Sequence, residues 1–180
     1  MRGSLAHDGE DDLMRCQLCG EDKKLIKAHI IPQCLYTPLK NPSGPIMQVF
    51  KTPDTPPRRT PTGEYDTGIL CADCDNHKLG CFDRYAGELL LKNLDVNTTK
   101  KYYVVQEYSY SSLKLFFLSV LWRMSVSTLP SVKKVKLGPF EAQIRDMLLR
   151  KDAGPPETFP IVLHRYIDLP CCVLPFQASV

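Results

Sequence analysis

Apolar residues recur at three- and four-residue steps between residues 73 and 91, as one face of an amphipathic helix requires. The residues on this face are Leu79, Phe82, Ala86, Leu89 and Leu90. A second helix is predicted over residues 113–127, where most positions are apolar and the helix should be buried. Gly138-Pro139 precedes a third predicted helix, over residues 140–151, and Gly154-Pro155-Pro156 ends it.

Short β-prone runs separate these helices and predict strands. They cover residues 25–31, 65–70, 102–108 and 161–167. Helices and strands mixed along one chain of 180 residues predict an α+β fold class.

Residues 32–64 stand out as a proline-rich insertion. Eight prolines fall between Pro32 and Pro61. Proline lacks an N–H donor and fixes φ, so this density is expected to prevent both helix and central strand and to leave the insertion extended. The predicted organisation is an acidic, disordered leader (1–13), a folded module (14–95) that contains the insertion (32–64), and a helical, mixed α+β C-terminal region (96–180).

Composition narrows the class of protein. The chain is 43% hydrophobic with a formal net charge of +3, which excludes a fully disordered protein. The most apolar run, residues 113–126, is interrupted by Lys114 and Arg123 and is shorter than the ~18–20 apolar residues that a bilayer requires. No secretory signal pattern opens the chain. We therefore expect a cytoplasmic protein without a membrane partner, whose mild positive charge is compatible with nucleic acid.

Two cysteine pairs carry the strongest chemical signal. Cys16 and Cys19 form one Cys-x-x-Cys pair, and Cys71 and Cys74 form a second. Four thiolates bind Zn²⁺ tetrahedrally, and a two-residue gap lets both sulfurs of a pair reach one ion. We predict a structural zinc site with a treble-clef-like arrangement; free or catalytic thiols are the alternative interpretation. A closed four-cysteine site leaves no open coordination position, so any catalysis must come from other residues.

His29 is the candidate for catalysis. It lies ten residues beyond Cys19, and the zinc spacing should place its strand against the helix that starts at Cys74. That helix carries Asp75 and His77, whose side chains are metal ligands of the hard and borderline types. A histidine in an apolar strand is otherwise most often a structural residue of the core.

At this point the sequence resembles a known family, the HNH endonuclease superfamily. The motifs that carry the resemblance are Cys16-x-x-Cys19, Ala28-His29-Ile30-Ile31-Pro32, Ile69-Leu70-Cys71-x-x-Cys74-Asp75-Asn76-His77 and Phe82-Asp83-Arg84. They are most similar to bacterial HNH-like proteins with a Ser/Ala-His-Ile-Ile-Pro block between two Cys-x-x-Cys pairs. The resemblance covers about residues 14–90 and implies a ββα-metal fold.

The resemblance also implies an activity, namely metal-dependent hydrolysis of phosphodiester bonds in DNA, in a setting such as phage defence. His29 would be the general base that activates a water molecule. Asp75 is the first candidate ligand, and His77 the second, for a catalytic Mg²⁺ or another divalent cation. A protein partner such as a defence ATPase is a further implication. Weak candidates for DNA contacts are the basic residues Lys23, Lys24, Lys27, Arg58 and Arg59.

A second interpretation stays open, in which the chain is a catalytically degenerate, zinc-stapled module that binds nucleic acid or a protein. Ala28 stands where many HNH enzymes have an Asp or His beside the base, and Thr67 stands where a strand Asn orients the catalytic histidine. Asp75 and His77 would also lie about 200° apart on an ideal helix, so they can face one ion only if the first helical turn is irregular.

Overall fold

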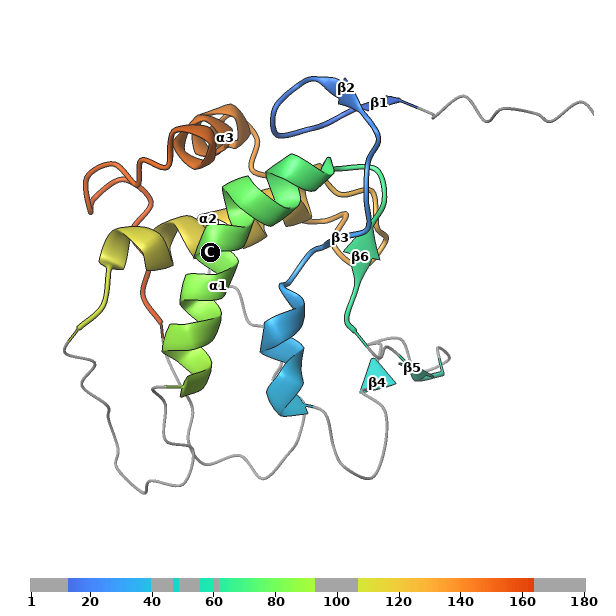
Figure 1. Cartoon of the computed structure of the whole chain (residues 1–180), viewed down its shortest axis with the longest axis horizontal. Helices are drawn as coiled ribbons and strands as arrows, with labels where there is room; N and C mark the ends of the chain where they lie inside the picture. Colours follow the sequence, from blue (N-terminus) through green and yellow to red (C-terminus); the bar gives the residue numbers. More distant parts are fainter. Residues whose placement is uncertain (1–12, 40–46, 49–55, 60–61, 93–106, 164–180) are drawn as a thin grey trace, which may run out of the picture.

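The computed structural model describes residues 13–39, 47–48, 56–59, 62–92 and 107–163. This part of the chain is mixed α/β, with three helices and small antiparallel sheets of two strands each (Figure 1). The strand pairs are β1 (Met14–Arg15) with β2 (Asp22–Lys23), β3 (Ala28–His29) with β6 (Tyr65–Asp66), and β4 (Met47–Gln48) with β5 (Arg58–Arg59).

A continuous helical segment follows β6 and confirms the helix predicted over residues 73–91. Its central part is the α-helix α1 (Gly80–Gly87), and π-helical turns flank it at Cys74–Leu79 and Glu88–Lys92. The face predicted from the periodicity is the one that packs inward, since Leu79, Phe82 and Ala86 are buried. The irregular first turn is a feature that the apolar pattern does not show, and π-helical turns are frequent at functional sites.

The two helices predicted nearer the C-terminus are α2 (Tyr110–Val126) and α3 (Phe140–Arg150). Lys151 adopts the left-handed conformation at φ 55° and ends α3, so the helix stops before the Gly-Pro-Pro sequence predicted to end it. Residues 161–163 are irregular, and the rest of the strand predicted over 161–167 lies outside the described residues. The strand predicted over 102–108 lies outside them too, except for its last two residues, which are not in a strand.

Two predictions need correction. The run 65–70 is a strand only at Tyr65–Asp66, because residues 67–69 turn to bring Cys71 opposite Leu25. The prolines of the insertion do not prevent helix, since Gln33–Leu39 forms a 3₁₀-helix. Pro32 precedes this helix, where no donor is required, and its carbonyl accepts the Leu35 N–H at 3.0 Å.

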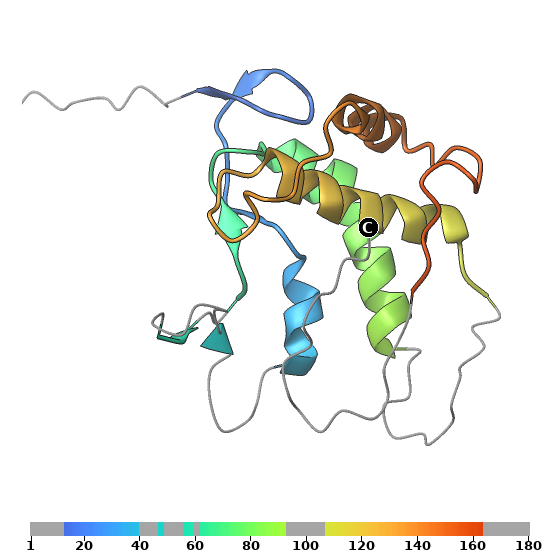
Figure 2. The ribbon, with the colours of Figure 1, turned by 180° about the vertical axis from the view of Figure 1, so that it is seen from behind.

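Helix α2 is the centre of the described core. It packs against α1 on one side and α3 on the other, as the two opposite views show (Figures 1 and 2). Trp122 is fully buried, as expected from its apolar surroundings, together with Leu118 and, from α3, Leu148. Because α2 is covered on more than one side, its buried residues fall all around the helix. No helix among the described residues is long and apolar enough to span a bilayer.

A buried carboxylate joins the β3–β6 pair to the residues that follow α2. Asp66 accepts hydrogen bonds from the Ser127 hydroxyl at 2.7 Å, the Thr128 N–H at 3.1 Å and the Gly68 N–H at 2.8 Å. These bonds fix the position of the strand that carries His29 relative to α2, because Ala28 and His29 pair directly with Asp66 and Tyr65.

Candidate functional site

The four cysteines predicted to bind metal converge in space. The sulfur atoms of Cys16, Cys19, Cys71 and Cys74 all lie within 4.8 Å of one another. Four sulfurs at the Zn–S bond length of about 2.3 Å would sit roughly 3.8 Å apart around a tetrahedral ion, so the arrangement fits the ion. Within the part of the chain that the structure describes, no other group of three or more His, Cys, Asp or Glu side chains gathers in this way.

Local backbone structure explains how the first pair is presented. Gly20 adopts φ +78°, which glycine tolerates without strain, and its N–H donates to the Cys16 carbonyl at 2.8 Å. The Cys16 N–H donates to the Glu21 carbonyl at 2.9 Å, which closes the turn between β1 and β2. The Gln17 N–H reaches the Ile69 carbonyl at 2.9 Å and so ties the first pair to the segment that carries the second.

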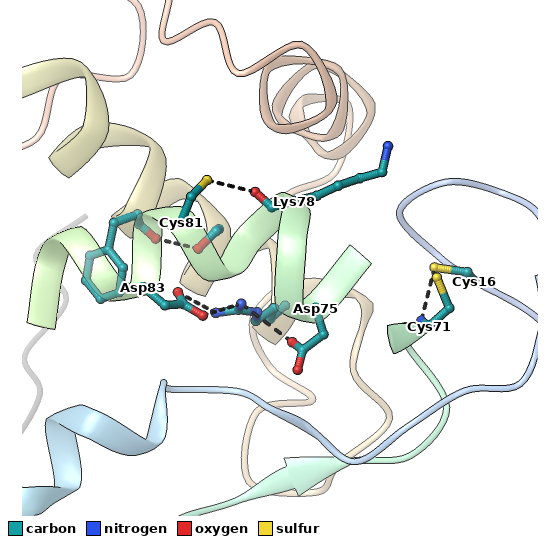
Figure 3. Close-up of polar contacts among 9 residues, drawn as sticks. Cys16, Cys71, Asp75, Lys78, Cys81 and Asp83 are labelled. Atoms are coloured by element: carbon teal, nitrogen blue, oxygen red, sulfur yellow. Dashed lines mark hydrogen bonds and ion pairs between the residues drawn. The ribbon is translucent and has the colours of Figure 1, made fainter. Parts of the chain in front are cut away.

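The electrostatics of the cluster suit a thiolate site. Burial alone would raise the pKa of Cys16, but N–H donors, including that of Cys71 at 3.4 Å, bring it to about 7 (Figure 3). Burial raises the pKa of Cys74, and the neighbouring sulfurs raise it further. A metal ion resolves this conflict, because it stabilises all four thiolates at once.

The remaining described cysteines are not part of the cluster. Cys34 donates to the Asp83 carbonyl at 3.9 Å. Cys81 donates to the Lys78 carbonyl at 3.2 Å (Figure 3). Both are partly buried, as small side chains with weak S–H donors often are. Cys171 and Cys172 lie outside the described residues.

His29 lies on β3 with its ring edge toward Tyr65, at 6.2 Å between ring centroids. Its Nε2 atom is buried and has no hydrogen-bond partner in the structure. A structural histidine of the core normally has its ring nitrogens satisfied, since a buried polar atom without a partner is costly. Among the described residues, Nε1 of Trp122 and Nε of Arg123 are also buried without a partner, but of the three only the imidazole nitrogen of His29 is able to accept a proton.

Two carboxylates from the helical segment share one buried guanidinium (Figure 3). Arg123 of α2 is 1% exposed and binds Asp83 through two hydrogen bonds, of 3.1 Å and 2.8 Å. The same guanidinium approaches Asp75 at 3.7 Å. Arg123 thus belongs chiefly to Asp83, in the bidentate geometry that arginine favours, and leaves Asp75 with a longer contact.

The pKa of the Asp75 carboxyl group is affected by Arg123, Asp83 and His29. Burial raises the pKa of its carboxyl, and the negative charge of Asp83 acts in the same direction. The charge of Arg123, followed by that of His29, lowers it, but the net shift is upward. Of these four influences on the pKa of Asp75, that of His29 is the smallest.

The other predicted site residues have the following surroundings in the structure. His77 is exposed and does not join Asp75 in a cluster of donors. Lys23 pairs with Glu21, Lys27 lies 5.3 Å from the centre of the Tyr65 ring, and Lys24 has an interaction partner of its own. Arg58 and Arg59 form β5, with Arg59 exposed.

Sequence reasoning missed Arg123 and Asp83 as members of the site. The signal for Arg123 was present, since a cation in the middle of a buried helix must find a partner. Its partner could not be named, because Asp83 is forty positions away and only the packing of α1 on α2 brings them together.

Comparison with known proteins adds no relative: no protein-family model matches the chain, and no curated protein and no solved structure is significantly similar to it.

Proposed function

We propose that the protein is a metal-dependent endonuclease of the HNH type that hydrolyses phosphodiester bonds in DNA. The observation that carries the proposal is the buried, unpartnered Nε2 of His29 on strand β3. The antiparallel pair β3–β6 is followed by a helix, and the four cysteines gather in one cluster, which supports the proposal of a ββα-metal, treble-clef-like unit. The resemblance of the motifs supports the same assignment.

His29 would act as the general base. A neutral imidazole nitrogen without a hydrogen-bond partner is able to accept a proton from a water molecule. The Tyr65 ring and the strand pairing restrict how the imidazole can turn. The same restriction would hold Nε2 toward the attacking water during proton transfer.

Asp75 would hold the divalent cation. Mg²⁺ is commonly bound through one or two carboxylates, with water and substrate phosphate as the other ligands, so a single aspartate fits this role. When bound, the cation would stabilise negative charge on the phosphate and on the leaving oxygen. Arg123 can release Asp75 without losing its own main partner, since its short bonds go to Asp83.

The test is cleavage of plasmid DNA with Mg²⁺, Mn²⁺ or Ni²⁺ by the wild type and three variants. His29→Ala and Asp75→Asn are expected to lower the cleavage rate at least 100-fold, the lower end of the usual general-base contribution. His7→Ala removes an imidazole outside the described residues and should cleave like the wild type. Zinc content and circular dichroism verify that each variant is folded. Equal cleavage by His29→Ala and the wild type in all three metals would refute the nuclease.

The 3.7 Å contact between Arg123 and Asp75 favours one other function. If Arg123 permanently neutralises Asp75, the site cannot hold a catalytic cation, and the chain would be a zinc-stapled module that binds DNA without cutting it. Salt-dependent DNA binding with no nicking in any metal would support this alternative.

A further inference from the structure

A pocket of about 260 Å³ lies apart from His29, between the turn of the first cysteine pair, α2 and the start of α3. Its lining includes Arg15 and Gln17 from the turn region, Glu141 and Arg145 from α3, and the fully buried Trp122 from α2. None of the residues discussed for cleavage contributes to it. The function proposed above therefore leaves this pocket unexplained.

The guanidinium groups of Arg15 and Arg145 both lie beside Gly20, in the turn between β1 and β2. A Cβ atom placed on Gly20 would lie 3.2 Å from Nη2 of Arg145 and 3.5 Å from Nη2 of Arg15. The two cations thus approach the same point, which a glycine keeps open. Among the described residues, no carboxylate forms an ion pair with either of them.

Arg145 is held in place by its own chain. Its Nε donates to the carbonyls of Gln17 at 2.9 Å and Leu18 at 2.7 Å, so the guanidinium is oriented before any ligand arrives. Arg15 is exposed on β1 and is able to close on a ligand from the other side. A fixed cation paired with an adjustable one is a favourable arrangement for capturing an anion.

The charges around the pocket are mixed. Glu141 carries one negative charge, and its Oε2 accepts a hydrogen bond from the Ser125 hydroxyl. The first turn of α3, to which Glu141 and Ala142 belong, adds the positive end of a helix dipole. Zinc bound by four thiolates would leave a net negative charge at Cys16, so neutralising that cluster is the competing role for the two arginines.

We propose that this pocket binds a backbone phosphate of a nucleic-acid strand through Arg15 and Arg145. Planar guanidinium forks match the oxygens of a phosphodiester, and the first turn of a helix favours the same charge. The proposal rests on the proposed function in that the phosphate belongs to DNA. It assigns Arg15, which no sequence motif singled out, as a binding residue remote from the cleavage residues.

The experiment measures binding of a labelled phosphorothioate DNA duplex between 50 and 200 mM salt, without added divalent cation, to the wild type, Arg15→Gln, Arg15→Lys and Lys134→Gln. Loss of one phosphate contact should reduce the slope of log K against log salt by about 0.9 in Arg15→Gln. Arg15→Lys keeps the charge and should retain most of the slope. Lys134→Gln removes one exposed charge outside the pocket and should keep the wild-type slope.

Three results would overturn the pocket assignment. The first is a wild-type slope in both Arg15→Gln and Lys134→Gln. The second is a loss of zinc from Arg15→Gln with an unchanged slope, which would mean that the arginine neutralises the thiolates. The third is stabilisation of the protein against heat by inorganic phosphate with no effect on the DNA slope. The cleavage assay is read separately. A reduced salt slope in Arg15→Gln without DNA cleavage by the wild type would support phosphate binding in the pocket and refute the nuclease. DNA cleavage by the wild type with an unchanged slope in Arg15→Gln would refute phosphate binding in the pocket and support the nuclease.

Discussion

Asp66 shows how one side chain can join distant parts of this chain. It is 5% exposed and accepts three hydrogen bonds, two of them from residues more than sixty positions away. Burial would raise the pKa of its carboxyl, but the bonds from Ser127, Gly68 and Thr128 outweigh burial and lower it. The charged form is therefore the one that the fold stabilises.

Asp66→Asn is expected to lower the free energy of unfolding by about 2 kcal/mol at pH 7, because an amide cannot accept these bonds as a carboxylate does. The folded-state pKa lies below the unfolded value, so this stabilisation is present above the unfolded pKa and is lost as the pH falls through the folded pKa. Urea unfolding of both proteins from pH 7 to pH 3 measures it. A gap between wild type and variant that stays constant over this range would contradict the assignment.

Arg123 gives a second prediction about single residues. Arg123→Gln is expected to cost about 3–5 kcal/mol of stability, because it breaks a buried pair and leaves Asp83 and Asp75 without their shared cation. A double-mutant cycle with Asp83→Asn should give a coupling energy of about 1 kcal/mol or more, measured by denaturant unfolding. Arg150→Gln with Asp146→Asn is the matched exposed pair and should show a coupling of at most about 0.5 kcal/mol.

The sequence predicted some of these residues and not others, for physical reasons. The four cysteines could be grouped because their ligand spacing is local, two residues within each pair. His29 could be placed only relative to that frame. Arg123 and Arg145 act through long-range packing on helices, and a single sequence carries no record of which helix faces meet.

Among the elements, the helices were predictable, whereas the strands were predicted only in part, since β3 and β6 lie within the predicted runs 25–31 and 65–70 but are much shorter. Apolar periodicity located α1, a mostly apolar run located α2, and the Gly-Pro sequences on either side located α3. The described strands are only two residues long. The module is held together by the cluster of four cysteines, the Leu25–Cys71 bridge and the hydrogen bonds of Asp66, and not by an extended ladder of strands. The π-helical first turn depends on its tertiary surroundings, so periodicity alone could not reveal it.

Helix α2 begins with a capping residue, which gives a prediction for this element. The Ser109 hydroxyl accepts the Ser112 N–H at 3.2 Å, and the Ser109 N–H donates to the Tyr85 hydroxyl. Ser109→Ala is expected to destabilise the protein by about 1 kcal/mol through loss of the N-cap bond. Ser111→Ala, an exposed serine within the same helix, is the control and should change stability by less than about 0.5 kcal/mol. Thermal unfolding followed by circular dichroism compares the two.

For the molecule as a whole, the cysteine frame should decide whether the N-terminal half folds. Structural zinc contributes on the order of 10 kcal/mol of binding free energy, comparable to the ~5–15 kcal/mol stability of a domain. Cys16→Ser is therefore expected to lose the zinc ion, so that residues 14–31 unfold and no longer pack against the helix after Cys74. Any nuclease activity should be lost with them, although His29 is unchanged. Elemental analysis should find about one zinc per chain in the wild type.

Cys81→Ser is the matched control, because Cys81 is partly buried but outside the cluster. It should keep its zinc and its melting temperature within a few degrees. A metal-free wild-type preparation with native circular dichroism and an unchanged melting temperature would refute the role given to the four cysteines.

The position of the cysteine frame has a consequence for how this chain can vary. Cys16 and Cys71 meet although they are 55 positions apart, and the proline-rich insertion lies in the loop that they close. The entropy of closing a loop grows only slowly with its length, and doubling it costs about 0.6 kcal/mol. The binding free energy of a structural zinc ion, on the order of 10 kcal/mol, is much larger than this entropic cost. The length of chain between His29 and Tyr65 can therefore change at little cost in stability while the His29 strand and the helix after Cys74 stay in register.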